Sequence, residues 1–132
     1  MCGLTCAFGP DIPDSEEFKA FNNSLTHRGP DNKSTALIEQ NLLFGHTRLS
    51  IQDLTNASSQ PMEIKVPGSD VHKLSIVFNG EIYNFLDIRS ELVSLGHTFY
   101  STGDTEVLLR AYLEWGKDCI YCLLYTSPSP RD

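Results

Sequence analysis

Apolar residues occupy every second position at the start of the chain, and after that they recur at the spacing of a helix. Residues 2–8 alternate between apolar and smaller side chains, which predicts a buried strand that ends at a glycine and a proline. A helix is expected next, capped by Asp14 or Ser15, because three apolar residues then fall at helical spacing. Gly29-Pro30 would stop such a helix, so residues 27–31 are predicted to form a loop.

The middle of the chain has short runs typical of strands, and the later part has two helical patterns. The predicted strands cover residues 35–38, 42–46, 48–51 and 74–79. Apolar residues recur every three or four positions over 85–95 and 107–115, which indicates two amphipathic helices closed by Gly96 and Gly116. A short strand over 97–100 is expected between them. The candidate N-caps of these helices are Asn84 and either Asp104 or Thr105.

The order of these elements favours an α+β domain with mostly antiparallel sheets, because hairpins and helices follow each other without strict alternation. A chain of 132 residues, 40% hydrophobic and 20% charged, can bury one core. Its net charge of -7 disfavours a nucleic-acid partner. No apolar run approaches the roughly 20 residues that span a bilayer, and the N-terminus lacks a secretory signal. We therefore expect a cytoplasmic protein without a membrane partner, with its four cysteines as thiols.

The last eleven residues do not fit the rest of the chain. Residues 122–132 match the in-frame translation of a transposase sequencing-library adapter in every codon. Their Pro-Ser-Pro segment has no period from which to build a secondary-structure element. We therefore expect natural sequence over residues 1–121, truncated there, and a non-native tail over 122–132. The alternative is an ordinary polar tail.

Candidate chemistry begins at Cys2, directly after the initiator methionine. Removal of Met1 would leave an amine of pKa about 7.7 to 8.0 and a thiol of pKa about 8.5 on one residue. Such an amine can accept the thiol proton, directly or through one water, and later pass it to a leaving group. A small buried cysteine is the simpler interpretation of Met-Cys-Gly alone. The assignment therefore depends on the other motifs.

Six motifs follow one another in a characteristic order. They are Met1-Cys2-Gly3, His27-Arg28-Gly29-Pro30-Asp31, Gly45-His46-Thr47-Arg48-Leu49-Ser50-Ile51, Gln60-Pro61, Phe78-Asn79-Gly80-Glu81-Ile82-Tyr83-Asn84 and Gly103-Asp104-Thr105-Glu106. The ordered set resembles the class II glutamine amidotransferases, and residues 79–84 resemble the branch of the glutamine-hydrolysing asparagine synthetases. The resemblance implies an N-terminal-nucleophile hydrolase sandwich, in which two antiparallel sheets pack between helical layers. Residues 1–121 would be a partial domain of this kind.

The resemblance also implies a role for each residue of a glutamine site. Cys2 would attack the side-chain carboxamide, giving a γ-glutamyl thioester and ammonia, while the Asn79 amide and the Gly80 N–H stabilise the oxyanion. Arg48 would bind the α-carboxylate of glutamine, and Asp104 its α-ammonium group. Further parts of the glutamine pocket would be Leu49, Ser50, Ile51, Gln52 and Glu81.

Local sequence alone permits plainer interpretations of these residues, namely a strand-edge arginine at Arg48, an N-cap at Asp104 and a hairpin turn at 79–80. His27 and His46 are possible bases for Cys2, but the α-amine already supplies a base. Cys6 is expected in the core. No His or Cys pair at zinc spacing accompanies Cys2 and Cys6, so we expect no metal site.

In complete proteins of this family, ammonia passes to a second domain that uses ATP and magnesium to convert aspartate to asparagine. No ATP-binding loop occurs in the present sequence. We therefore expect no cofactor in this domain, glutamine as its substrate and a missing synthetase domain as its partner in cis. Three alternatives remain: the glutaminase half of another amidotransferase, a non-catalytic domain of the same fold, and a fragment that has lost strands and does not fold stably alone.

Overall fold

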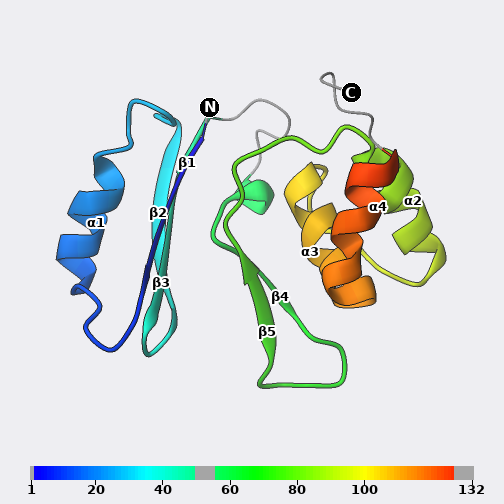
Figure 1. Ribbon diagram of the computed structural model, residues 1–132, viewed down its shortest axis with the longest axis horizontal. Helices are drawn as coiled ribbons and strands as arrows, with labels where there is room; N and C mark the ends of the chain where they lie inside the picture. Colours follow the sequence, from blue (N-terminus) through cyan, green and yellow to red (C-terminus); the bar gives the residue numbers. More distant parts are fainter. Residues whose placement is uncertain (1, 50–55, 127–132) are drawn as a thin grey trace.

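The computed structural model describes residues 2–49 and 56–126, which form two small antiparallel sheets and four α-helices (Figure 1). The strands are β1 (Gly3–Phe8), β2 (Asn32–Glu39), β3 (Leu42–Arg48), β4 (Met62–Lys65) and β5 (Lys73–Ile76). The helices are α1 (Ser15–Asn23), α2 (Phe85–Ser94), α3 (Asp104–Trp115) and α4 (Cys119–Thr126), with 3-10 turns at Asn56–Ser58 and Gly116–Asp118. This arrangement confirms the predicted α+β class. In Figure 1 the β4–β5 hairpin lies between the first sheet and the group of helices α2, α3 and α4, while α1 lies on the other side of the first sheet.

The first sheet has β3 at its centre, paired antiparallel with β1 and β2. Helix α1 packs on one face, where the Thr5 hydroxyl donates to Asn22 Oδ1 at 2.9 Å. A Cβ atom on Gly45 would lie 2.2 Å from Thr5 Oγ1 and 2.7 Å from Asn22 Oδ1. Only glycine at this position permits the helix and the strand to approach so closely.

The predicted strand at the N-terminus is confirmed, but the prediction of which face is buried was wrong. Gly3 and Thr5 are buried under α1, whereas the apolar residues between them point to the other face. There Leu4 is 43% exposed and Phe8 75% exposed, and Cys6, which we expected in the core, is exposed. The close approach of α1 selects small side chains, so the larger ones occupy the face that the described residues leave open.

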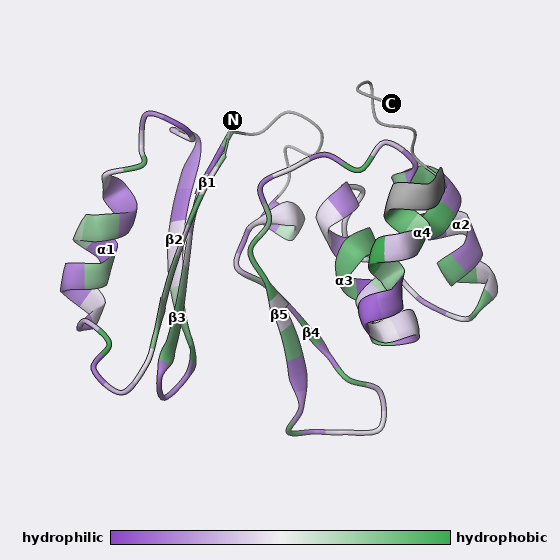
Figure 2. Cartoon of the chain, in the orientation of Figure 1, coloured by the Kyte–Doolittle hydropathy of each residue, from purple (hydrophilic) through white to green (hydrophobic). Residues whose placement is uncertain are grey.

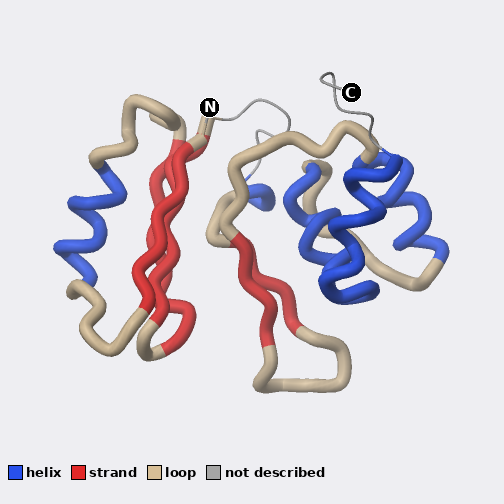
Figure 3. The backbone as a smooth tube through the Cα atoms, viewed as in Figure 1, coloured by secondary structure: helices blue, strands red, loops and turns tan. Residues whose placement is uncertain are grey.

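Two strand predictions differ from the structure in their bounds. The runs at 42–46 and 48–51 belong to one strand, β3, up to Arg48, and residues 50–55 lie outside the described part. The run at 74–79 is a strand only to Ile76, because the N–H of Phe78 donates to a side-chain oxygen at 2.5 Å. Figure 3 shows the chain then continuing as a loop from the hairpin to the helices.

The strand predicted over 97–100 is absent. The backbone N–H of Tyr100 donates to both carboxylate oxygens of Glu106 at 3.0 Å, so it is not available to a strand partner. Ser101 also donates to Glu106, from its N–H at 2.6 Å and from its hydroxyl at 2.7 Å. Side-chain bonds from α3 therefore fix this segment as a turn.

Helices α2 and α3 share one apolar core, as their predicted stripes indicated. Its buried members include Ile88, Leu92, Val107 and Ala111. Figure 2 shows hydrophobic colouring on the helices of this half. The N-cap of α3 is Gly103, which corrects the expected cap at Asp104 or Thr105, because both of those residues already lie in the helix.

Helix α4 corrects a prediction about the end of the chain. Residues 122–126 belong to this helix, although the sequence there was expected to form no element. Leu123 packs against the core of α2 and α3, and Cys119 is buried in that core. Tertiary packing therefore supplies the order that the local pattern lacks. Residues 127–132 lie outside the described part.

Candidate active site

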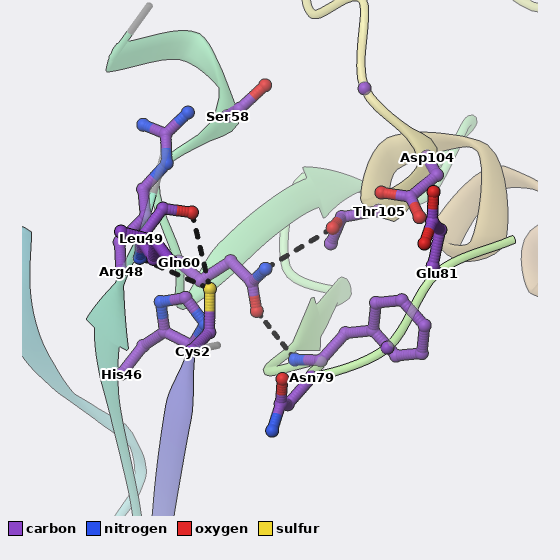
Figure 4. A pocket seen from close by; sticks show the side chains of 13 residues that line it. Cys2, His46, Arg48, Leu49, Ser58, Gln60, Asn79, Glu81, Asp104 and Thr105 are labelled. Carbon is purple, nitrogen blue, oxygen red and sulfur yellow. Dashed lines mark hydrogen bonds between the residues drawn. The ribbon is translucent and has the colours of Figure 1, made fainter. Parts of the chain in front are cut away.

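A pocket of about 330 Å³ opens where the end of the first sheet meets the loop after β5 and the start of α3 (Figure 4). This size is sufficient for a small molecule. Seven residues that the sequence predicted for the site line it: Cys2, Arg48, Leu49, Asn79, Gly80, Glu81 and Asp104. The other lining residues are His46, Ser58, Gln60, Phe78, Gly103 and Thr105. The predicted site residues Ser50, Ile51 and Gln52 lie outside the described part of the chain.

Cys2 directly precedes β1 and lies beside the end of β3 in the lining of the pocket. Because Gly3 pairs with Thr47, the Cys2 sulfur lies beside Leu49, whose N–H donates to Sγ at 3.3 Å. The thiol itself donates to the Leu49 carbonyl at 3.6 Å. The Cys2 carbonyl accepts a hydrogen bond from Arg28 Nε at 3.2 Å. Arg28 thus anchors the backbone of Cys2, a role that the motif alone did not reveal.

Gly29 brings the loop of Arg28 against the first sheet. A Cβ atom at Gly29 would lie within 2.4 Å of the backbone carbon and oxygen of Thr47. No residue with a side chain could therefore occupy this position without moving β3. His27, in the same loop, is exposed, and its Nδ1 lies 3.2 Å from the Ser24 carbonyl rather than in the pocket.

The two ends of the pocket carry opposite charge. Arg48, which is 8% exposed, lies at one end, and the carboxylates of Asp104 and Glu81 lie together at the other (Figure 4). Burial raises the pKa of Asp104, and the nearby charge of Glu81 raises it further, while a hydrogen bond from the Ile82 N–H at 3.0 Å opposes this shift. A ligand with a carboxylate and an ammonium group matches this distribution of charge.

Asn79 and Gly80 follow β5 in the exposed loop at the side of the pocket. A Cβ atom at Gly80 would lie 2.7 Å from the Phe78 ring, so the loop needs glycine unless the ring moves. The hairpin-turn interpretation of these two residues is wrong, because they lie in the connection from β5 to α2. Their role toward an oxyanion stays a prediction.

His46 lies in the wall of the pocket and is 2% exposed. Burial, together with the charge of Arg48, lowers its pKa to about 4, although a hydrogen bond with the backbone of Phe78 opposes the shift. Its Nε2 atom has no hydrogen-bond partner among the described residues. The imidazole is therefore neutral at pH 7 and a poor acceptor for a thiol proton.

Gln60 lies at the centre of the pocket wall, and sequence reasoning assigned it no role. Its side chain is hydrogen bonded to the Phe78 N–H at 2.5 Å and to the Thr105 hydroxyl at 3.2 Å (Figure 4). The motif Gln60-Pro61 was the only sequence signal that pointed to it.

Comparison with known proteins identifies the family of this site. Residues 1–124 match the family model of the glutamine amidotransferase domain. The chain belongs to the glutamine amidotransferase family. This membership confirms the resemblance to class II enzymes that the ordered motifs indicated. It is consistent with a cysteine thiol and two opposite charges in one pocket.

Several asparagine synthetases are similar to the chain. Glutamine-hydrolysing asparagine synthetase 3 of Bacillus subtilis is 39% identical over 123 residues, which are 91% of this chain and 19% of that protein. Glutamine-hydrolysing asparagine synthetase 1 of the same organism is 37% identical and is matched over 89% of this chain and 18% of its own length. A putative asparagine synthetase of Methanocaldococcus jannaschii is 33% identical over 91% of this chain and 25% of that protein. The chain thus spans about a fifth to a quarter of the length of these relatives.

Metal sites and membrane-spanning helices are two further features to consider in the described residues. No group of three or more His, Cys, Asp or Glu side chains there could hold a metal ion. None of the helices in this part of the chain is long and apolar enough to cross a membrane.

Proposed function

We propose that this amidotransferase domain hydrolyses free glutamine through a γ-glutamyl thioester on Cys2. The observation that carries the proposal is the pocket itself, in which the Cys2 thiol lies with a buried guanidinium at one end and two carboxylates at the other. Free glutamine has a carboxylate and an ammonium group to match them, and its carboxamide is the bond to be broken. A glutamine within a peptide has neither charge and would match neither end of the pocket.

The proposed reaction begins with removal of Met1, which frees the α-amine of Cys2. The amine takes the thiol proton, and the thiolate attacks the carboxamide carbon of glutamine. The Asn79 side chain and the Gly80 N–H stabilise the oxyanion that forms. The protonated amine then gives its proton to the leaving nitrogen, which departs as ammonia and leaves a thioester. Water attacks the thioester, its proton returns to the sulfur through the amine, and glutamate is released.

We further propose that the ammonia serves to convert aspartate to asparagine in a second domain of a longer protein. Two observations support this: the asparagine synthetases named above are 33% to 39% identical to this chain, and the chain covers only 18% to 25% of their length. That chemistry would use ATP and magnesium in the second domain, and the glutaminase domain would need no cofactor of its own.

We also propose that the complete domain is the two-sheet sandwich of the N-terminal-nucleophile hydrolases. The described first sheet is covered by α1 on one face only, and Leu4 and Phe8 remain exposed on the other. A second layer of strands on that face would bury them. The sandwich thus accounts for an apolar sheet face that this chain leaves exposed.

The test is a substitution of Cys2 in a full-length protein that carries this N-terminal sequence. The Cys2→Ala variant should lose glutamine hydrolysis, measured as glutamate formed, and glutamine-dependent asparagine synthesis. Asparagine synthesis from added ammonium salts should continue near the parent rate, because that route bypasses the thioester. Glutaminase activity retained in Cys2→Ala would refute the proposed nucleophile. Loss of the ammonium-dependent synthesis in a parent that hydrolyses glutamine would refute the proposed acceptor.

A further inference from the structure

Gln60 links three parts of the molecule that are far apart in the sequence. Its carbonyl accepts a hydrogen bond from the Ser34 hydroxyl on β2, and its side-chain Oε1 accepts from the N–H of Phe78 at 2.5 Å. Its Nε2 donates to Thr105 Oγ1 at 3.2 Å, in the first turn of α3. The side chain is 7% exposed, so water does not replace these bonds easily.

The carboxamide suits this position because it carries an acceptor and a donor on one planar group. Oε1 faces a backbone N–H, which can only donate, so Nε2 must point to the Thr105 hydroxyl. A carboxylate there would add a buried negative charge near Asp104 and Glu81. An apolar side chain of the same length would leave the Phe78 N–H without its acceptor.

One of the two segments that Gln60 joins carries the proposed oxyanion donors, and the other carries the proposed partner of the substrate ammonium group. Phe78 directly precedes Asn79 and Gly80, the proposed oxyanion donors. Thr105 directly follows Asp104, the proposed partner of the substrate ammonium group. The Gln60 side chain therefore joins the loop of the oxyanion donors to the first turn of α3, in addition to the bond from the Ile82 N–H to Asp104 itself (Figure 4).

We propose that Gln60 is a positioning residue for glutamine hydrolysis, which holds the oxyanion loop in register with the first turn of α3. This inference rests on the proposed function. It assigns separate effects to the two side-chain bonds. The bond to Phe78 acts on kcat, since it places the oxyanion donors. The bond to Thr105 acts on KM, since it places Asp104.

The first test separates these effects in a full-length protein that carries this sequence. Gln60→Met removes both bonds at similar length and should lower kcat by roughly tenfold to a hundredfold, because misplacement by about 1 Å has effects of that order. Its KM for glutamine should also rise. Thr105→Val removes only the second bond and should raise KM several-fold while kcat stays within about twofold. Thr105→Ser keeps a hydroxyl and should restore the parent KM.

The matched control is Ser59→Ala, one residue before Gln60. Ser59 accepts a hydrogen bond from Asn32 Nδ2 at 3.2 Å, so its loss loosens the same segment from the first sheet but touches neither the loop nor α3. This variant should keep the parent kcat and KM. The values of kcat and KM are calculated per amount of folded protein, and the melting temperature is measured for each variant. A purely structural role of Gln60 would lower the melting temperature and leave kcat and KM unchanged.

A binding measurement distinguishes failure of this inference from failure of the proposed function. In a Cys2→Ala background, calorimetry should show weaker binding of L-glutamine to Thr105→Val than to Thr105→Ser. Equal affinities, together with unchanged kcat and KM in Gln60→Met, would overturn the positioning role while leaving Cys2 as the nucleophile. If Gln60→Met does not fold, the pair of Thr105 variants decides the inference by the same criteria.

Discussion

At the scale of the residue, burial decides whether a histidine in the pocket can act as a base. His46 lines the same pocket as Cys2 and would be the obvious base in a cysteine–histidine pair. Burial lowers its pKa to about 4, and the charge of Arg48 contributes to the same shift. The sequence gives a separate reason against His46 as the base, namely that the α-amine of Cys2 can serve in that role. The burial that weakens His46 could not be read from a strand pattern.

His46 should make the stability of the chain depend on pH. Its pKa is about 4 when folded and 6.5 when unfolded, so the unfolded state binds the proton more tightly. The stabilisation is complete above pH 6.5 and is lost as pH falls toward 4. Between pH 7 and pH 5 we expect a loss of about 2 kcal/mol in the free energy of unfolding, measured with urea. His46→Gln should remove that part of the slope, and an unchanged slope would contradict the assignment.

At the scale of the element, α3 organises both its own N-terminus and the turn before it. Glu106 accepts hydrogen bonds from Tyr100 and Ser101, and Arg110 Nε donates to it at 2.9 Å. Burial alone would raise the pKa of Glu106, but these hydrogen bonds more than offset that effect and hold it below its ordinary value. The bonds fix the turn that leads into Asp104 at the pocket.

Glu106→Gln should therefore act on both stability and substrate binding. The amide keeps one acceptor but presents an N–H₂ group to backbone donors, so we expect a loss of about 2 to 3 kcal/mol in unfolding free energy. KM for glutamine should rise, because Asp104 follows the turn that Glu106 holds. Glu114→Gln on the same helix, whose side chain is 35% exposed beside His97, is the matched control. Equal effects in the two variants would contradict the special role of Glu106.

At the scale of the whole molecule, the sequence predicted the element types and the residues of the pocket well. It predicted less well which segments pack against each other. The amphipathic stripes of α2 and α3 were readable because one period decides their buried face. The face of β1 was not readable, since Gly3 and Thr5 are buried through the approach of α1 and not through their own hydrophobicity. Gln60 was missed because its partners are 18 to 45 residues away in the sequence.

The open face of the first sheet leads to opposite expectations for the isolated chain and for a complete protein. Phe8 is 75% exposed here, so Phe8→Ser should cost the isolated chain little stability. In a longer protein whose added strands cover that face, the same substitution should lower unfolding free energy by about 2 to 4 kcal/mol. Leu37→Ser is the control, because Leu37 is 62% exposed and lies on the α1 side of the sheet. A small effect of Phe8→Ser in both proteins would contradict the sandwich.

The central claim is that the amine and the thiol of Cys2 act together. The most direct measurement compares two preparations of one full-length protein, with and without Met1, whose N-terminal state is confirmed by intact mass. The account predicts glutamine hydrolysis only in the preparation that begins at Cys2, with a loss of at least about a hundredfold when Met1 is retained. Equal rates of glutamate formation in the two preparations would contradict it.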